Sequence, residues 1–82
     1  MKGRGYINMS YAKLRGKIRE VFKMESKFAE KMGMDRSTLS LKLNGKSEWS
    51  RIEIEKACYL LNIQIEEVYA YFFTEKVGFS QQ

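Results

Sequence analysis

The stretch FAEKMGMDRSTLSLKLNGK, from Phe28 to Lys46, decides the fold that the sequence predicts. It predicts two short helices joined by a glycine turn. Ala29 is followed four residues later by Gly33 and ten residues later by Leu39. The small Ala29 lets the second helix cross closely, Gly33 can adopt a positive φ, and Leu39 anchors the second helix on the first. The stretch therefore predicts a rigid helix-turn-helix unit with one exposed helix.

Local signals set the boundaries of these two helices and of the helix before them. The first of the pair is predicted over about Ser26–Met32. Asp35 is placed to cap the second, which is predicted over about Arg36–Leu43 and ends at Asn44-Gly45. A preceding helix over about Tyr11–Lys23 is predicted by an apolar stripe with helical spacing, formed by Leu14, Ile18, Val21 and Phe22.

A fourth helix is predicted to begin with a capping box, in which Ser50 and Glu53 satisfy each other's backbone N–H groups. Trp49 is placed to pack on Ile54 as a hydrophobic staple. The buried stripe of this helix is predicted to be Ile54, Ala57, Cys58 and Leu61. Because free cysteine is among the most buried residue types, we interpret Cys58 as a packed apolar residue and not a nucleophile.

A fifth helix is predicted from about Ile65 to Phe73. Its aromatic residues are too many to face inward together, and they are Tyr69, Tyr71, Phe72 and Phe73. One interpretation is that Tyr69 and Phe72 complete the core while the other two lie partly exposed. The other is a homodimer interface, where aromatic residues are enriched. We favour the interface, with all four residues as its candidates.

Length and composition limit the chain to one all-α domain. It has 82 residues, 44% of them hydrophobic, and no proline. We expect a flexible arm at residues 1–10, the helical domain at 11–74 and a tail at 75–82. The single cysteine excludes an internal disulfide, the absence of histidine argues against a zinc site, and no stretch has enough apolar residues to span a membrane. We therefore expect a cytoplasmic protein with no metal, cofactor or small-molecule substrate.

The charges are distributed unevenly along the chain. The first 46 residues hold twelve Lys or Arg against four Asp or Glu, a net +8, and the rest hold three against six, a net −3. The basic half coincides with the predicted helix-turn-helix, which favours a surface that faces a polyanion. The alternative is that these charges only solvate helix faces.

Five short motifs, in this order and spacing, resemble a known family: Phe28-Ala29, Met32-Gly33, Leu39-Ser40, Asn44-Gly45-Lys46 and the segment from Leu60 to Ile63. Residues from about Leu14 to Phe73 resemble the Cro and phage-repressor type of helix-turn-helix domain, the lambda-repressor-like fold shared with the xenobiotic-response-element regulators. The segment from Tyr71 to Val77 further resembles small phage-encoded members of this group. The resemblance implies a five-helix domain that binds double-stranded DNA.

The resemblance also implies which residues contact DNA. The helix-three positions that face base edges in similar domains are occupied by Arg36, Ser37 and Leu41, with Ser40 adjacent. An arginine can bond guanine bidentately, and a leucine can pack on thymine methyl groups. The positions expected to contact phosphate, which supply affinity without sequence information, are Ser26, Lys27, Thr38, Lys42, Asn44, Lys46 and Arg51.

Two positions depart from the pattern of similar domains. Glu25 stands where a glutamine often bonds phosphate. Because a carboxylate there would repel DNA, we exclude Glu25 from the site. Lys42 stands where an apolar residue usually packs, which suggests a rotated helix with Leu43 in the core and Leu41 partly buried.

These expectations combine into a Cro-like repressor, encoded by a phage or prophage, that binds a palindromic operator as a homodimer. Its recognition helices would lie in successive major grooves and exclude polymerase or a rival repressor. Two non-DNA alternatives are a helix-turn-helix used only for packing and a protein-interaction module of the same fold, such as an antirepressor or an antitoxin-like partner. An enzyme is disfavoured, because the chain has no histidine and its acidic residues form no evident metal-binding cluster.

Overall fold

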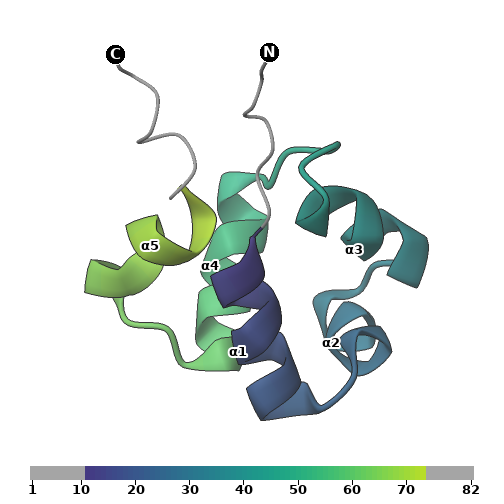
Figure 1. Ribbon diagram of the computed structural model, residues 1–82, viewed down its shortest axis with the longest axis horizontal. Helices are drawn as coiled ribbons and strands as arrows, with labels where there is room; N and C mark the ends of the chain where they lie inside the picture. The colour runs from purple at the N-terminus through teal and green to yellow at the C-terminus, as the bar shows by residue number, and fades with distance from the viewer. Residues whose placement is uncertain (1–10, 74–82) are drawn as a thin grey trace.

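The computed structural model describes residues 11–73, which form five α-helices, one turn of 3₁₀-helix and no strand (Figure 1). The elements in chain order are α1 (Ala12–Phe22), α2 (Glu25–Met32), α3 (Arg36–Leu43), α4 (Arg51–Leu61), η1 (Ile65–Glu67) and α5 (Val68–Phe72). The prediction of an all-α fold with five helices is confirmed. The predicted arm at 1–10 and tail at 75–82 lie outside the described residues.

The helices are arranged around α1 and α4. Figure 1 shows α2 and α3 together on one side of α1 and α5 on the other, with α4 packed against α1 and α2. The α2–α3 pair is therefore held as a unit at one end of the molecule.

The turn between α2 and α3 has the geometry that its glycine predicts. Gly33 has a φ of 78°, and its backbone N–H donates to the carbonyl oxygens of Ala29 and Glu30 at the end of α2. A side chain in this left-handed region is strained, which is why glycine is favoured there. Asp35 occupies the position before α3, as predicted, but its side chain makes no cap hydrogen bond.

The start of α4 confirms the predicted capping box. The Ser50 hydroxyl accepts from the Glu53 backbone N–H at 3.1 Å, and the Glu53 carboxylate accepts from the Ser50 backbone N–H at 2.9 Å. Both bonds satisfy donors that the first turn of a helix leaves open. The start of α4 is therefore well defined.

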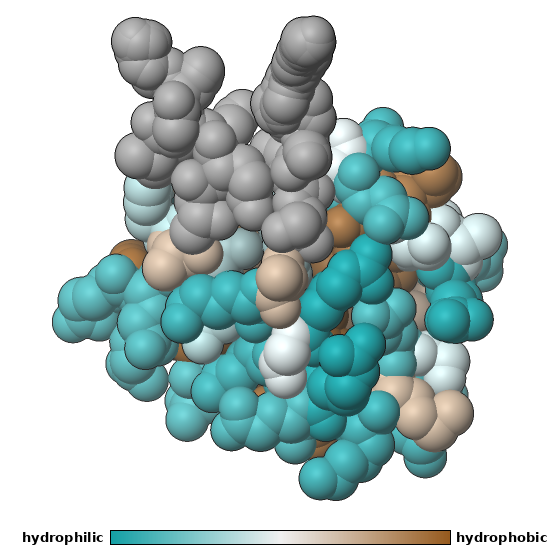
Figure 2. Space-filling model, in the orientation of Figure 1, coloured by the Kyte–Doolittle hydropathy of each residue, from teal (hydrophilic) through white to brown (hydrophobic). Residues whose placement is uncertain are grey.

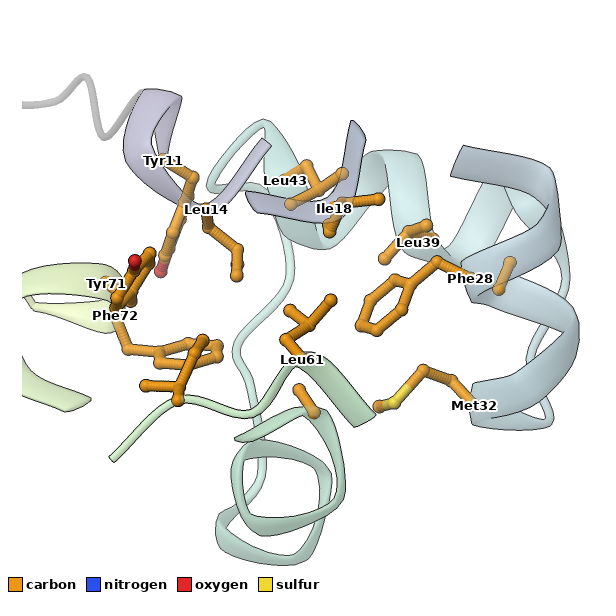
Figure 3. Packing of buried hydrophobic residues seen from close by; sticks show 13 residues of the cluster. Tyr11, Leu14, Ile18, Phe28, Met32, Leu39, Leu43, Leu61, Tyr71 and Phe72 are labelled. Atoms are coloured by element: carbon orange, nitrogen blue, oxygen red, sulfur yellow. The ribbon is translucent and has the colours of Figure 1, made fainter. Parts of the chain in front are cut away.

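The core joins side chains from all five helices. Figure 3 shows Phe28, Leu39 and Leu61 pointing toward one another between α2, α3 and α4, while Tyr11 and Phe72 pack at the α5 end. The predicted α1 stripe is correct except at Val21, which is exposed. Phe22, also predicted in the stripe, is partly buried, and its ring packs on Phe28 with 5.4 Å between centroids.

The last helix differs from the prediction in the residues that it buries. Tyr71 and Phe72 are buried, whereas Tyr69 and Phe73 are exposed. The Tyr71 ring lies 4.7 Å from the Lys13 ammonium, and the Phe72 ring packs edge-on against Trp49 at 5.2 Å. Since Tyr71 and Phe72 are occupied inside the chain, the structure corrects their assignment to a dimer interface.

Candidate nucleic-acid interface

The exposed face of α3 holds the four side chains predicted to contact bases. Arg36, Ser37, Ser40 and Leu41 are all exposed, with Leu41 at 48%. Helical spacing places Ser37, Ser40 and Leu41 on one side of α3, turned away from the fully buried Leu39, and Arg36 extends this exposed surface at the first turn. The expectation that Leu41 would turn partly inward is wrong, and Leu43 is the core residue as predicted.

The exposed face of α3 carries no acidic side chain of its own. No residue of α3 is acidic, and Arg36 makes no ion pair or side-chain hydrogen bond with any of residues 11–73. Figure 2 shows that the side of the molecule that carries α1 is also covered mainly by hydrophilic residues. An unpaired guanidinium at a helix N-terminus remains available to an outside acceptor, and its five N–H donors suit planar or anionic groups.

The predicted phosphate-binding residues are mostly exposed beside this face. Ser26 and Lys27 lie in the first turn of α2, and Asn44 and Lys46 follow the end of α3. Arg51 is also exposed, although its Nε donates to Glu55 at 3.0 Å. Thr38 is half-buried within α3.

The structure corrects the expectation that Lys42 contacts phosphate. Lys42 is buried, and its Nζ lies 3.0 Å from a Glu53 carboxylate oxygen and donates to the Glu48 carbonyl oxygen at 2.8 Å. Its position three residues after Leu39 turns it toward the core. The sequence already held this signal, because Lys42 stands where similar domains carry an apolar residue. Its ammonium ties α3 to the start of α4 instead.

The Glu53 carboxylate is held in its charged form by these contacts. Partial burial acts to raise the pKa of Glu53, but the Ser50 backbone N–H and the Lys42 ammonium together outweigh burial, so its pKa is lowered from the ordinary value. Glu53 is therefore shared between the capping box and an ion pair that positions α3.

The contacts that Arg15 makes with α2 and with the end of α3 were not predicted from the sequence. Arg15 lies on α1, yet its guanidinium donates from Nη1 to Glu25 at 3.0 Å and from Nη2 to the Asn44 side-chain oxygen at 2.8 Å. Arg19 lies 3.9 Å from the same Glu25 oxygen. The helical spacing of α1 predicts only that Arg15 is partly exposed. It cannot predict the partners of Arg15, which are 10 and 29 residues away along the chain.

A hollow lies at the α5 end of the molecule. Its wall contains Tyr11, Trp49, Ile54 and Phe72, with a volume of about 310 Å³. Trp49 and Ile54, the two residues of the predicted staple, both line this hollow. The Trp49 indole nitrogen is buried and has no hydrogen-bond partner among residues 11–73.

Cys58 fits the role predicted for it as a packing residue. It is half-buried against the core, and burial raises the pKa of its thiol. A raised pKa keeps the thiol protonated and unreactive at neutral pH.

Metal-binding and membrane-spanning features were searched for in residues 11–73. No three His, Cys, Asp or Glu side chains within this range come together in a way that could hold a metal ion. None of the described helices has the length and apolar character needed to cross a bilayer.

Comparison with known proteins places the chain in a family. A family model described as "Protein of unknown function (DUF739)" matches residues 7–75. The chain belongs to this family. No curated protein matched it.

Among solved structures, the DUF739 chain is similar to the solution structure of the modulator of repression of the temperate bacteriophage TP901-1 from Lactococcus lactis. The two share 38% sequence identity and superpose with a TM-score of 0.74. The match covers 87% of this chain and 96% of the phage protein. The likeness therefore extends over nearly the whole of that protein.

Proposed function

We propose that the protein is a phage-type transcriptional regulator that binds double-stranded operator DNA, with α2 and α3 as its helix-turn-helix. One observation carries the proposal: α3 exposes Arg36, Ser37, Ser40 and Leu41 on one face that contains no acidic residue. The similar phage protein adds support for a regulatory role, because its name states that it modulates repression.

In this proposal α3 lies in the major groove. Arg36, which has no partner among residues 11–73, bonds guanine O6 and N7, a contact worth about 1–3 kcal/mol of base discrimination. Leu41 packs on thymine methyl groups. The exposed Asn44 and Lys46 contact the phosphates next to the groove and set the register of α3.

The proposed regulator acts as a homodimer whose interface keeps Tyr69 and Phe73 from the predicted set, leaves out the buried Tyr71 and Phe72, and adds Ile65. Ile65, Tyr69 and Phe73 are spaced four residues apart and are all exposed. The Tyr69 and Phe73 rings stack with 5.7 Å between centroids, so the two exposed aromatic side chains lie together. Two-fold pairing of this stripe would match a palindromic operator.

Alanine substitutions separate base contacts from phosphate contacts. Arg36→Ala should relax base preference at one operator position, whereas Lys46→Ala should weaken binding to all duplexes and reduce the salt slope by about one unit. Lys13→Ala is the charge-matched control, because Lys13 lies over the Tyr71 ring on the α5 side of α1. If all three variants weaken every duplex equally, the assignment of α3 to base contacts is wrong.

A second candidate is a protein-interaction module that acts on another regulator. The name of the similar phage protein favours it, since repression can be modulated by contact with a repressor and not with DNA. The exposed Tyr69 and Phe73 would then be the contact surface. Loss of regulation in Tyr69→Ser with unchanged DNA affinity would favour this candidate, and parallel loss of dimerisation and DNA affinity would favour the operator-binding dimer.

A further inference from the structure

An acidic residue lies in the middle of a basic hollow beside the proposed recognition helix. Glu25 is the first residue of α2, and the hollow around it is lined by Arg15, Arg19, Lys23, Met24, Ser26 and Arg36. The hollow therefore joins α1, the start of α2 and the start of α3. An unneutralised carboxylate at this place would repel a DNA phosphate.

The Glu25 carboxylate is neutralised and largely covered by two arginines. Its side chain is only 15% exposed, and one of its oxygens lies 3.0 Å from Arg15 and 3.9 Å from Arg19. A carboxylate at the first residue of a helix is also favoured by the helix dipole. Glu25 is thus stable as a charged group within the basic hollow.

Arg15 extends this contact to the far end of α3. Its planar guanidinium bonds Glu25 with one nitrogen and the Asn44 side-chain oxygen with the other. The Asn44 amide nitrogen lies 3.4 Å from the Ser40 hydroxyl, within hydrogen-bond reach. A chain of polar contacts therefore runs from the start of α2, through α1, to the exposed face of α3.

We propose that Glu25 is a positioning residue for DNA binding. It fixes Arg15, which orients Asn44 and Ser40, and it holds Arg19 at the edge of the hollow. A backbone phosphate is then bound by Arg19 and Arg36, which both line the hollow. This inference rests on the proposed DNA-binding function and specifies how one part of its surface is organised.

Glu25 could position the arginines or only repel phosphate, and these two roles predict opposite effects of Glu25→Gln on DNA affinity. If Glu25 only repels phosphate, removing its charge tightens DNA binding and steepens the salt dependence. If Glu25 positions the arginines, the variant binds on the order of tenfold more weakly, about the worth of one charged hydrogen bond. Its salt slope falls by up to about one unit as Arg19 leaves the phosphate.

Glu30→Gln is the matched control, because Glu30 lies exposed on the same helix and its side chain makes no hydrogen bond or ion pair within residues 11–73. It makes the same charge change and should leave affinity unchanged or slightly increased. Thermal unfolding of both variants, followed by circular dichroism, establishes that binding is measured on folded protein.

Arg15→Lys tests the bridge without changing charge. A lysine ammonium lacks the planar fork, so it cannot hold Glu25 and Asn44 in the same geometry. We expect Arg15→Lys to weaken binding severalfold with an unchanged salt slope. In the Arg15→Lys background, Glu25→Gln should weaken binding by much less than its tenfold effect in the wild type, because the two residues act as one unit.

Tighter or unchanged binding by Glu25→Gln, or wild-type binding by Arg15→Lys, would overturn the inference and leave the proposed function intact. Failure of the wild-type protein to bind any duplex more tightly than a charge-only control would overturn both.

Discussion

The ion pair between Lys42 and Glu53 predicts an asymmetric response to mutation. Lys42 is nearly covered, whereas the Glu53 side chain is 29% exposed. Removing Glu53 leaves the buried ammonium with only the Glu48 carbonyl oxygen as a partner. Removing Lys42 leaves a carboxylate that still accepts from the Ser50 backbone N–H and still reaches water.

The expected magnitudes follow from this geometry. Breaking a buried pair by removing one partner costs about 3–5 kcal/mol, and the partial exposure of Glu53 places this pair at the low end. Glu53→Ala also loses half of the capping box, which costs about 1 kcal/mol more, so its total cost is about 4 kcal/mol and its Tm falls by roughly 15–30 °C. Lys42→Met removes the charge and keeps the volume, so its stability stays within about 1 kcal/mol of wild type.

Urea unfolding at pH 7 measures both variants, and the double variant completes the cycle. The double variant should be more stable than Glu53→Ala alone, because no unpaired ammonium remains in the core. Equal losses in the two single variants, or a loss below about 1 kcal/mol in Glu53→Ala, would refute the assignment of Lys42 to the interior.

Three further predictions concern single groups. The pKa of Glu53 is lowered in the folded state, so its contribution to stability is complete above the unfolded glutamate pKa of about 4.3 and is lost as the pH falls through the folded value. Between pH 7 and pH 3, the urea midpoint of Glu53→Gln should therefore drop less steeply than that of the wild type. Gly33→Ala should cost about 1–2 kcal/mol in a thermal melt through backbone strain alone, since no atom lies within 4 Å of the added Cβ, and an unchanged melt would contradict the left-handed turn. Since burial raises the pKa of Cys58, iodoacetamide at pH 8 should modify it more slowly than a free cysteine peptide, and equal rates would contradict its packing.

Local signals in the sequence were sufficient for the helix boundaries. The glycine at position 33 and the capping box at Ser50 and Glu53 each act through the backbone of neighbouring residues. Such contacts need no knowledge of the tertiary fold, so the ends of α2, α3 and α4 could be predicted.

The orientation of α5 and the contacts of Arg15 could not be predicted in the same way. The predicted fifth helix begins with η1, a 3₁₀-helix with three residues per turn. This tighter turn rotates the residues that follow relative to a regular α-helix, so that Tyr71 is buried in place of Tyr69. Arg15 meets Asn44 only because the folded chain brings α1 close to the end of α3. Both depend on tertiary packing, which periodicity does not contain.

The central claim is that α3 binds operator DNA by sequence. Selection from a randomised duplex library at physiological salt, followed by affinity measurements on the selected duplex and a scrambled control across salt concentrations, tests it most directly. We predict an inverted repeat with half-sites about one helical turn apart, bound at least about a thousandfold more tightly than the control. Weak binding that ignores sequence and disappears with added salt would contradict the claim and favour the protein-interaction candidate.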